Sequence, residues 1–112
     1  MSEPGLDEQI HHPTRLAVVA FLSGCAEAEF GAVKEQCGLT SPTLSKLVTA
    51  LEAVGYVRAR KGYLGKRPRT WLSLTAEGRS ALEGHLAALR ELVEGNRRDG
   101  AAYQDAAGEA KL

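Results

Sequence analysis

The fold is decided by residues 56–76, YVRARKGYLGKRPRTWLSLTA. Two runs rich in apolar and aromatic residues, 56–60 and 70–74, flank a tip over residues 61–69 that is rich in Gly, Pro and cations. This pattern is typical of two strands joined by a loop. We therefore predict a two-stranded hairpin with a long, basic loop.

The charge of this stretch differs from that of the rest of the chain. It holds six basic residues and no acidic one, although the 112-residue chain balances 14 Lys and Arg against 14 Asp and Glu. Residues 1–55 carry a net charge of −4, and residues 77–112 a net charge of −2. Because the surplus positive charge lies in one short segment, we expect that segment to face a polyanion.

Two helices are predicted near the amino end. The first begins at Pro13, which suits the first turn of a helix, and it is apolar on every side over residues 16–22. A helix of this kind must be covered on more than one face, so one face is expected on the core and another against a partner subunit. The second helix covers residues 30–37 and ends at Gly38, which can take the left-handed conformation.

A third helix is predicted over residues 41–54. Thr40 or Ser41 serves as its N-cap, and Pro42 lies in its first turn. Its apolar residues are spaced by three and four and form one core stripe, while its opposite face carries small, uncharged or basic groups. This small-residue face favours close approach to another molecule.

The last helix is predicted to start after Thr75, its N-cap, with Leu82, Leu86 and Leu89 in an apolar stripe. The flanks of the chain lack such patterns. We expect a disordered lead over residues 1–9, one folded domain over residues 10–94, and a flexible tail over residues 95–112.

The order of these elements is helix, helix, turn, capped helix, basic hairpin and helix. It describes a mainly α protein with a small β-wing, a winged helix-turn-helix. Five stretches carry a resemblance to the MarR-like group of bacterial transcriptional regulators, from residue 10 to about residue 92. These stretches are IHHPTRLAVVAFL at 10–22, LT at 39–40, LSKL with LEAVGYV at 44–47 and 51–57, GKRPRT at 65–70, and LTAEGR at 74–79.

The resemblance implies a double-stranded DNA partner, with the third helix in the major groove and the wing, residues 58–70, on the backbone or in the minor groove. Because the helix face offers no Arg, Asn or Gln, we expect phosphate contacts and groove shape to supply much of the affinity. The candidate DNA-binding residues are Ser41, Thr43, Ser45, Lys46, Thr49, Arg58, Lys61, Lys66, Arg67 and Arg69. Arg58 and Arg60 alternate with Val57 and Ala59, so they can also be the solvated face of a strand.

The apolar first helix and the leucine stripe of the last helix predict a homodimer, which we expect to bind a palindromic site and to act as a repressor. A small-molecule effector is left open, and the sequence does not give its identity. The candidate interface residues are Leu16, Val19, Leu82, Leu86 and Leu89. Two alternatives stay open: a winged-helix module that binds another protein, and a DNA-binding thiol or metal sensor that uses Cys25 and Cys37.

Other function classes lack support in the sequence. No arrangement of Ser-His-Asp, Cys-His or paired carboxylates points to catalysis, and we predict that the protein is not an enzyme and needs no metal or other cofactor. Cys25 and Cys37 match no compact zinc spacing, and small, partly buried side chains are their simplest interpretation. No signal peptide or membrane-spanning run is present, so we expect a cytoplasmic protein.

Overall fold

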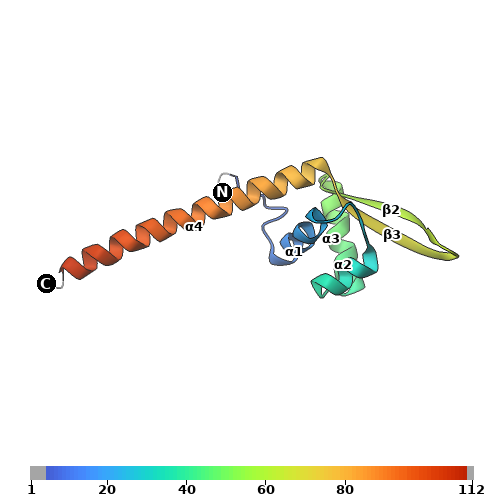
Figure 1. Ribbon diagram of the computed structural model, residues 1–112, viewed down its shortest axis with the longest axis horizontal. Helices are drawn as coiled ribbons and strands as arrows, with labels where there is room; N and C mark the ends of the chain where they lie inside the picture. Colours follow the sequence, from blue (N-terminus) through green and yellow to red (C-terminus); the bar gives the residue numbers. More distant parts are fainter. Residues whose placement is uncertain (1–4, 111–112) are drawn as a thin grey trace.

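A computed structural model describes residues 5–110 of the chain, and its side chains up to residue 104. It consists of four helices and a three-stranded sheet (Figure 1). The elements in chain order are α1 (Pro13–Ser23), β1 (Ala28–Glu29), α2 (Phe30–Cys37), α3 (Ser41–Ala53), β2 (Val57–Leu64), β3 (Arg67–Leu74) and α4 (Ala76–Ala110).

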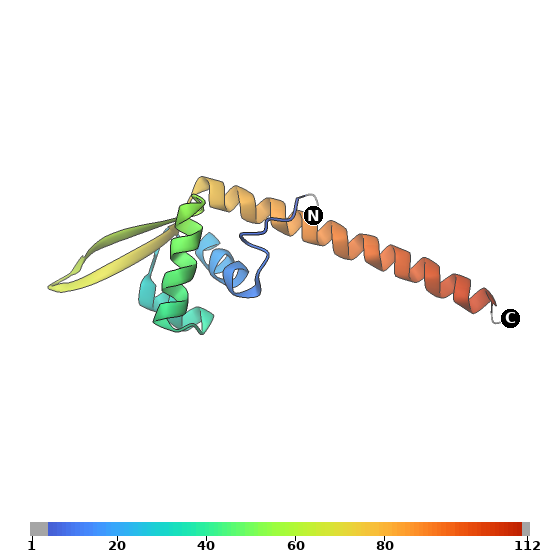
Figure 2. The same ribbon diagram turned by 180° about the vertical axis from the view of Figure 1, so that it is seen from behind.

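The molecule is elongated, measuring 76 by 24 by 23 Å. Helices α1 to α3 form the body, while the β2–β3 hairpin and the distal part of α4 project from it in opposite directions (Figures 1 and 2). No helix within the described residues is both long enough and apolar enough to cross a bilayer.

Local signals define the helix-turn-helix. Gly38 ends α2 in the left-handed conformation, with φ of +64°. The Thr40 side chain then accepts a hydrogen bond from the Thr43 N–H and caps α3, and Pro42 lies in the first turn. These features confirm the predicted turn between the two helices.

The core joins the body to the base of the hairpin. The predicted core stripe of α3 consists of Leu44, Leu47, Val48, Leu51 and Val54. The first four are buried in this core, whereas Val54 is 37% exposed. The buried apolar residues are Ile10, Val18, Val19, Leu22, Val33, Leu44, Leu47, Val48, Leu51, Val57, Leu72, Leu74 and Leu82.

The hairpin differs from its prediction. Instead of a long loop over residues 61–69, the strands stay paired up to Leu64 and Arg67, and only Gly65 and Lys66 form the turn. Gly65 has a φ of +65°, which suits the first central position of a tight hairpin turn. The cations predicted for a loop are therefore held on a regular ladder.

The sheet also contains a third strand. β1 pairs with β3 through Ala28 opposite Leu72 and Glu29 opposite Trp71, so the strand order is β1-β3-β2. For residues 26–29 the sequence predicted a short connection and left a brief strand open, and the structure confirms that strand at its last two residues. β1 covers β3 only near its carboxyl end, which leaves the stretch around Pro68 without a second neighbour, where proline is tolerated.

Residues 5–10 differ from the disordered lead predicted for residues 1–9. The Asp7 N–H donates to His85 Nδ1 over 3.0 Å, and the Tyr56 hydroxyl donates to an Asp7 carboxylate oxygen. That bond, with burial, raises the pKa of Tyr56 to about 12. His85 is fully buried, and burial together with the nearby His11 lowers its pKa. Residues 1–4 lie outside the described part of the chain.

Helix α4 continues past residue 94, where the sequence placed the end of the folded domain, through Gly95 and Gly100 to Ala110. A helix of 35 residues is about 52 Å long, so its distal half extends beyond the body. Whether this distal segment is flexible stays a prediction.

Candidate nucleic-acid interface

The exposed face of α3 carries the five candidates predicted on this helix. Ser41, Thr43, Ser45, Lys46 and Thr49 are all solvent-exposed. The helix is oriented by its opposite face, which is buried in the core, so these short side chains lie on the outside of the body. A helix held in this way can be placed against another molecule without disturbing the core.

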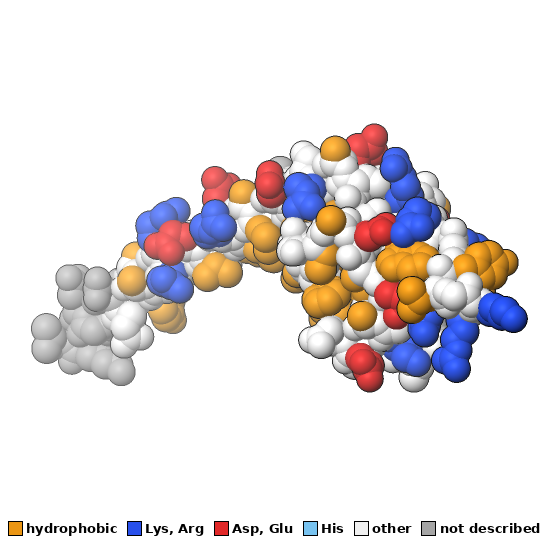
Figure 3. Space-filling model, turned by 45° about the vertical axis from the view of Figure 1, so that its right-hand side comes forward, with side chains coloured by type: hydrophobic (Ala, Val, Ile, Leu, Met, Phe, Trp, Pro, Cys, Tyr) orange, Lys and Arg blue, Asp and Glu red, His pale blue; other side chains and the backbone are white. Residues whose placement is uncertain are grey.

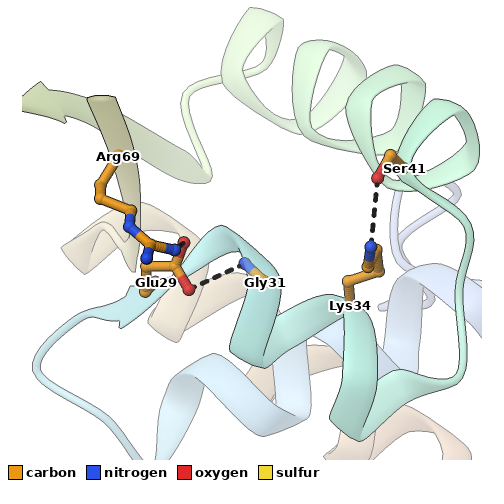
Figure 4. Close-up of polar contacts among 5 residues, drawn as sticks. All are labelled: Glu29, Gly31, Lys34, Ser41 and Arg69. Carbon is orange, nitrogen blue, oxygen red and sulfur yellow. Dashed lines mark hydrogen bonds and ion pairs between the residues drawn. The ribbon is translucent and has the colours of Figure 1, made fainter. Parts of the chain in front are cut away.

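Several of these hydroxyls already have partners within the protein. Lys34 Nζ donates to Ser41 Oγ over 3.4 Å, which joins α2 to the start of α3 (Figure 4). Thr43 receives a hydrogen bond from Thr40 Oγ1, and Thr49 Oγ1 donates to the backbone oxygen of Ser45. Lys46 makes no ion pair among the described residues, so its ammonium is available to a ligand.

On the wing, the structure divides the cations into two groups. Arg58, Lys61, Lys66 and Arg67 are exposed and make no ion pair within the described part of the chain. These four residues are the free cations of the wing. Lys66 lies at the turn and Arg67 beside it, which places both at the extreme end of the hairpin.

Arg60 belongs to the second group. Its guanidinium donates to Glu27 over 2.6 Å and stacks 4.5 Å from the centre of the Trp71 ring. The hydrogen bond from Arg60 lowers the pKa of Glu27 and raises that of Arg60. Arg60 is thus held at the wing base by an acid that lies outside the basic stretch.

Arg69, a predicted DNA contact, is likewise paired. Its Nη1 lies 3.2 Å from Glu29 Oε1 (Figure 4). Its Nε is buried and has no hydrogen-bond partner among the described residues. The other oxygen of Glu29 accepts the Gly31 N–H, 3.1 Å away, and so caps α2. Glu29 therefore connects the wing to the helix-turn-helix. The sequence concealed this link because Glu29 is 40 residues from Arg69.

The wing and α3 meet around a shared hollow of about 590 Å³. The hollow is lined by Ser45 from α3, by Phe30 and Glu29 at the start of α2, and by residues of both wing strands. Lys61, Gly62, Tyr63, Pro68, Arg69 and Thr70 form the wing side. Basic side chains gather at this end of the molecule (Figure 3). The arrangement is an open concavity beside an exposed helix, in which Lys61 is the lining cation without an ion pair among the described residues.

The candidate dimer residues need correction at two positions. Val19 and Leu82 are 0% and 5% exposed and pack inside the protomer's own core, so neither is available to a partner. Leu16 and Leu89 are half-buried, whereas Leu86 is 40% exposed. The apolar stripe of α4 starts in the core and becomes exposed as the helix leaves the body, a change that periodicity alone does not reveal.

The two cysteines are free thiols and both are half-buried. Burial raises the pKa of Cys37, which disfavours the reactive thiolate at neutral pH. The Cys25 thiol donates to the Phe21 carbonyl oxygen over 3.5 Å. No cluster of three or more His, Cys, Asp and Glu side chains suited to a metal occurs among the described residues. These observations support the simpler interpretation of the cysteines as packing residues.

The link through Glu29 leads to a stability prediction. Replacing Glu29 by alanine removes the α2 cap and the ion pair with Arg69, and we expect a loss of about 1 kcal/mol in the free energy of unfolding. Urea unfolding followed by circular dichroism measures this loss. Glu27→Ala is the matched control, because its ion pair is exposed and should not shift the midpoint detectably. Equal midpoints for Glu29→Ala and Glu27→Ala would contradict the assigned link.

Comparison with known proteins gives one family match. Residues 14–93 match the family model described as a winged helix DNA-binding domain. The chain is 30% identical over 78 residues to the uncharacterized protein MJ0432 of Methanocaldococcus jannaschii, covering 70% of this chain and 85% of that protein.

Solved structures agree with this match. A transcriptional regulator homologue from Pyrococcus horikoshii superposes with a TM-score of 0.74 at 27% identity, covering 80% of this chain and 88% of that one. The YusO protein of Bacillus subtilis gives a TM-score of 0.68 at 22% identity, with 94% and 76% covered.

Proposed function

The chain belongs to the winged helix DNA-binding domain family, which confirms the MarR-like resemblance of its sequence, and from this premise we propose a specific mode of action. The protein is a transcriptional regulator that binds a palindromic duplex site as a homodimer in the cytoplasm. Residues 10–94 supply both DNA binding and dimerisation. The regulator acts as a repressor, since occupying a promoter site is enough to exclude other proteins.

The observation that carries this proposal is the position of the free cations of the wing relative to α3. In a chain of zero formal net charge, four exposed cations lie on the hairpin that flanks the exposed face of α3, and none of them makes an ion pair among the described residues. They are Arg58, Lys61, Lys66 and Arg67. A helix fits the major groove, which is about 12 Å wide, and the hairpin then lies over the neighbouring backbone. Phosphates would neutralise the charges that the protein itself leaves unpaired.

Base readout by α3 would be modest. Ser45 and Lys46 point from the exposed face, and Thr43 and Thr49 can offer methyl groups to thymine. The Ser41 hydroxyl is already held by Lys34, which favours a positioning role at the helix start. Phosphate contacts and the shape of the groove therefore supply most of the affinity in this proposal.

Salt-dependent DNA binding tests the proposal. Fluorescence anisotropy would follow binding to a labelled duplex from the protein's own upstream region, with random DNA beside it. For about six phosphate contacts we expect log Kobs against log salt concentration to fall with a slope near −5. In Lys66→Ala/Arg67→Ala the slope should be shallower by about 2, with a loss of about tenfold or more in affinity.

A matched control removes the same charge elsewhere. Arg98 is exposed on distal α4, so Arg98→Glu lowers the net charge by the same two units without altering the wing. We expect its slope and affinity to match the wild type. An equal loss in Arg98→Glu and in Lys66→Ala/Arg67→Ala would mean that only net charge matters. No binding to either duplex at low salt would instead favour a module that binds another protein.

A further inference from the structure

We propose that Tyr63 and Leu64 form an apolar wedge that fills the minor groove beside the site of α3. The proposal rests on the DNA-binding function above and assigns a role to two side chains that the charge pattern does not explain. Tyr63 and Leu64 are 73% and 64% exposed, although neither is polar enough to favour water. Both lie at the end of the hairpin.

The ladder fixes the position of each side chain. Tyr63 pairs with Pro68 and Leu64 with Arg67, and a two-residue turn closes the hairpin directly beyond them. Because neighbouring residues of a strand point to opposite faces, Tyr63 and Leu64 lie on opposite faces of the wing. Tyr63 and Pro68 share the face that lines the hollow beside Ser45 of α3. The tip is therefore a narrow edge with an apolar group on either side.

The surroundings of this pair identify the occupant by its chemistry. Lys61, Lys66 and Arg67 are the cations beside Tyr63 and Leu64 on the hairpin. The two acids that pair with wing arginines, Glu27 and Glu29, lie at the wing base. In Figure 3, hydrophobic side chains are exposed among Lys and Arg at this end. A surface with apolar groups enclosed by cations matches a groove whose walls are deoxyribose and whose rims are phosphate.

The dimensions agree with this choice. The minor groove is about 6 Å wide, which excludes a helix but admits the edge of a hairpin. With the tip inserted, Tyr63 would contact the sugars of one strand and Leu64 those of the other, while Lys66 and Arg67 reach phosphates on the rims. Apolar side chains are common in proteins that bind the minor groove, where they often wedge between base steps. The contact proposed for Tyr63 and Leu64 is with the sugars of the groove walls. Because these contacts carry no charge, they should not release counterions.

That difference gives a measurable signature. We expect Tyr63→Ala to weaken binding about 5- to 20-fold at every salt concentration, with the slope of the salt titration unchanged. Tyr63→Phe should bind like the wild type. Tyr103→Ala is the matched control, since Tyr103 is 77% exposed on distal α4 and should bind unchanged. Thermal unfolding should show the same midpoint for all three variants.

Leu64→Lys distinguishes the wedge from binding through charge alone, because the two hypotheses predict opposite changes in DNA affinity. If the tip binds only through charge, the added lysine should strengthen binding and steepen the slope. If Leu64 fills the groove, binding should weaken about fivefold at high salt, where charge is screened. Hydroxyl-radical footprints report sugar exposure directly, and Tyr63→Ala and Leu64→Lys should each lose protection at minor-groove sugars flanking the α3 site.

The outcomes of the proposed function and of the wedge are distinct. No DNA binding by the wild type would overturn the function and the wedge together. Wild-type binding with unchanged affinity in Tyr63→Ala would overturn the wedge alone. The wedge would also be overturned if Tyr63→Ala made the salt slope shallower, because the ring would then act by holding the neighbouring cations.

Discussion

Replacing Gly78 by alanine is expected to lower the free energy of unfolding by about 2–4 kcal/mol, through overpacking against rigid backbone. An added Cβ would overlap the Tyr56 carbonyl oxygen and lie 2.8 Å from Leu74 Cδ1. Tyr56 cannot easily retreat, because its carbonyl oxygen accepts the Thr75 N–H at 2.9 Å. Gly78 thus marks the point where α4 crosses the base of the wing in close contact.

Gly84 is the matched control in the same helix. No atom would lie within 4 Å of its added Cβ, and the residue is exposed. Gly84→Ala should therefore stabilise the protein by about 0.5–1 kcal/mol, because alanine favours the helix and restricts the unfolded chain. Urea unfolding of the two variants should give shifts of opposite sign. A Gly78→Ala variant as stable as the wild type would show that α4 and the wing base do not pack this closely.

The two glycines show what a sequence alone can predict. Their helix propensity is identical, so the sequence assigns both the same cost in α4. Only the crossing of α4 over Tyr56 distinguishes them, and that crossing is a contact between distant parts of the chain. The short stretch LTAEGR resembles the MarR-like pattern, and the close approach at Gly78 is a physical reason for a glycine there.

Signals contained within a few residues predicted their elements well. Gly38 ends α2, Thr40 caps α3, and Thr75 accepts the Gly78 N–H at 2.9 Å to begin α4. Each depends on a cap or turn whose chemistry is local. The exposed face of α3 also followed from periodicity, because one apolar stripe determines the direction of the opposite face.

Features that depend on pairing between distant residues were predicted less well. The hairpin was predicted with too long a loop because Gly, Pro and cations suggest a loop, although strand pairing continues to Leu64 and Arg67. β1 is two residues long, and the sequence left it open as a brief strand without giving its pairing with β3. The ion pairs of Arg60 and Arg69 were missed for the same reason, because their partners Glu27 and Glu29 lie just before and within β1. The division of wing cations into free and paired groups therefore needed the structure.

The proposed dimer gives the second large effect, a loss of self-association when the α4 stripe is made polar. Leu86 and Val93 are 40% and 53% exposed, and Leu89 lies between them on the same side of the helix. Figure 3 shows hydrophobic side chains along one side of the projecting α4. Such a stripe on an extended helix is expected to pack against a partner, and a second copy offers the same stripe related by a two-fold axis.

Leu86→Gln/Val93→Gln places four polar side chains in that proposed two-fold interface without adding charge. We expect the dissociation constant of the dimer to rise by about 100-fold or more, because each Gln amide would lose its water on burial and the apolar contacts of the replaced Leu or Val would be lost. Ala87→Gln is the control, because Ala87 is exposed on the other side of α4 and should leave the dimer intact. Sedimentation equilibrium measures the association directly.

DNA binding by the same variants then connects the dimer to recognition. A dimer engages both halves of a palindrome, so the polar variant should bind the full site about 100-fold more weakly but bind a single half-site like the wild type. Unchanged half-site binding would show that α3 and the wing remain folded and competent. If Leu86→Gln/Val93→Gln still sediments as a dimer, the interface does not lie on the α4 stripe, and the half-buried Leu16 side of α1 becomes the candidate interface. A monomeric wild type with full affinity for one half-site would remove the dimer from the proposal.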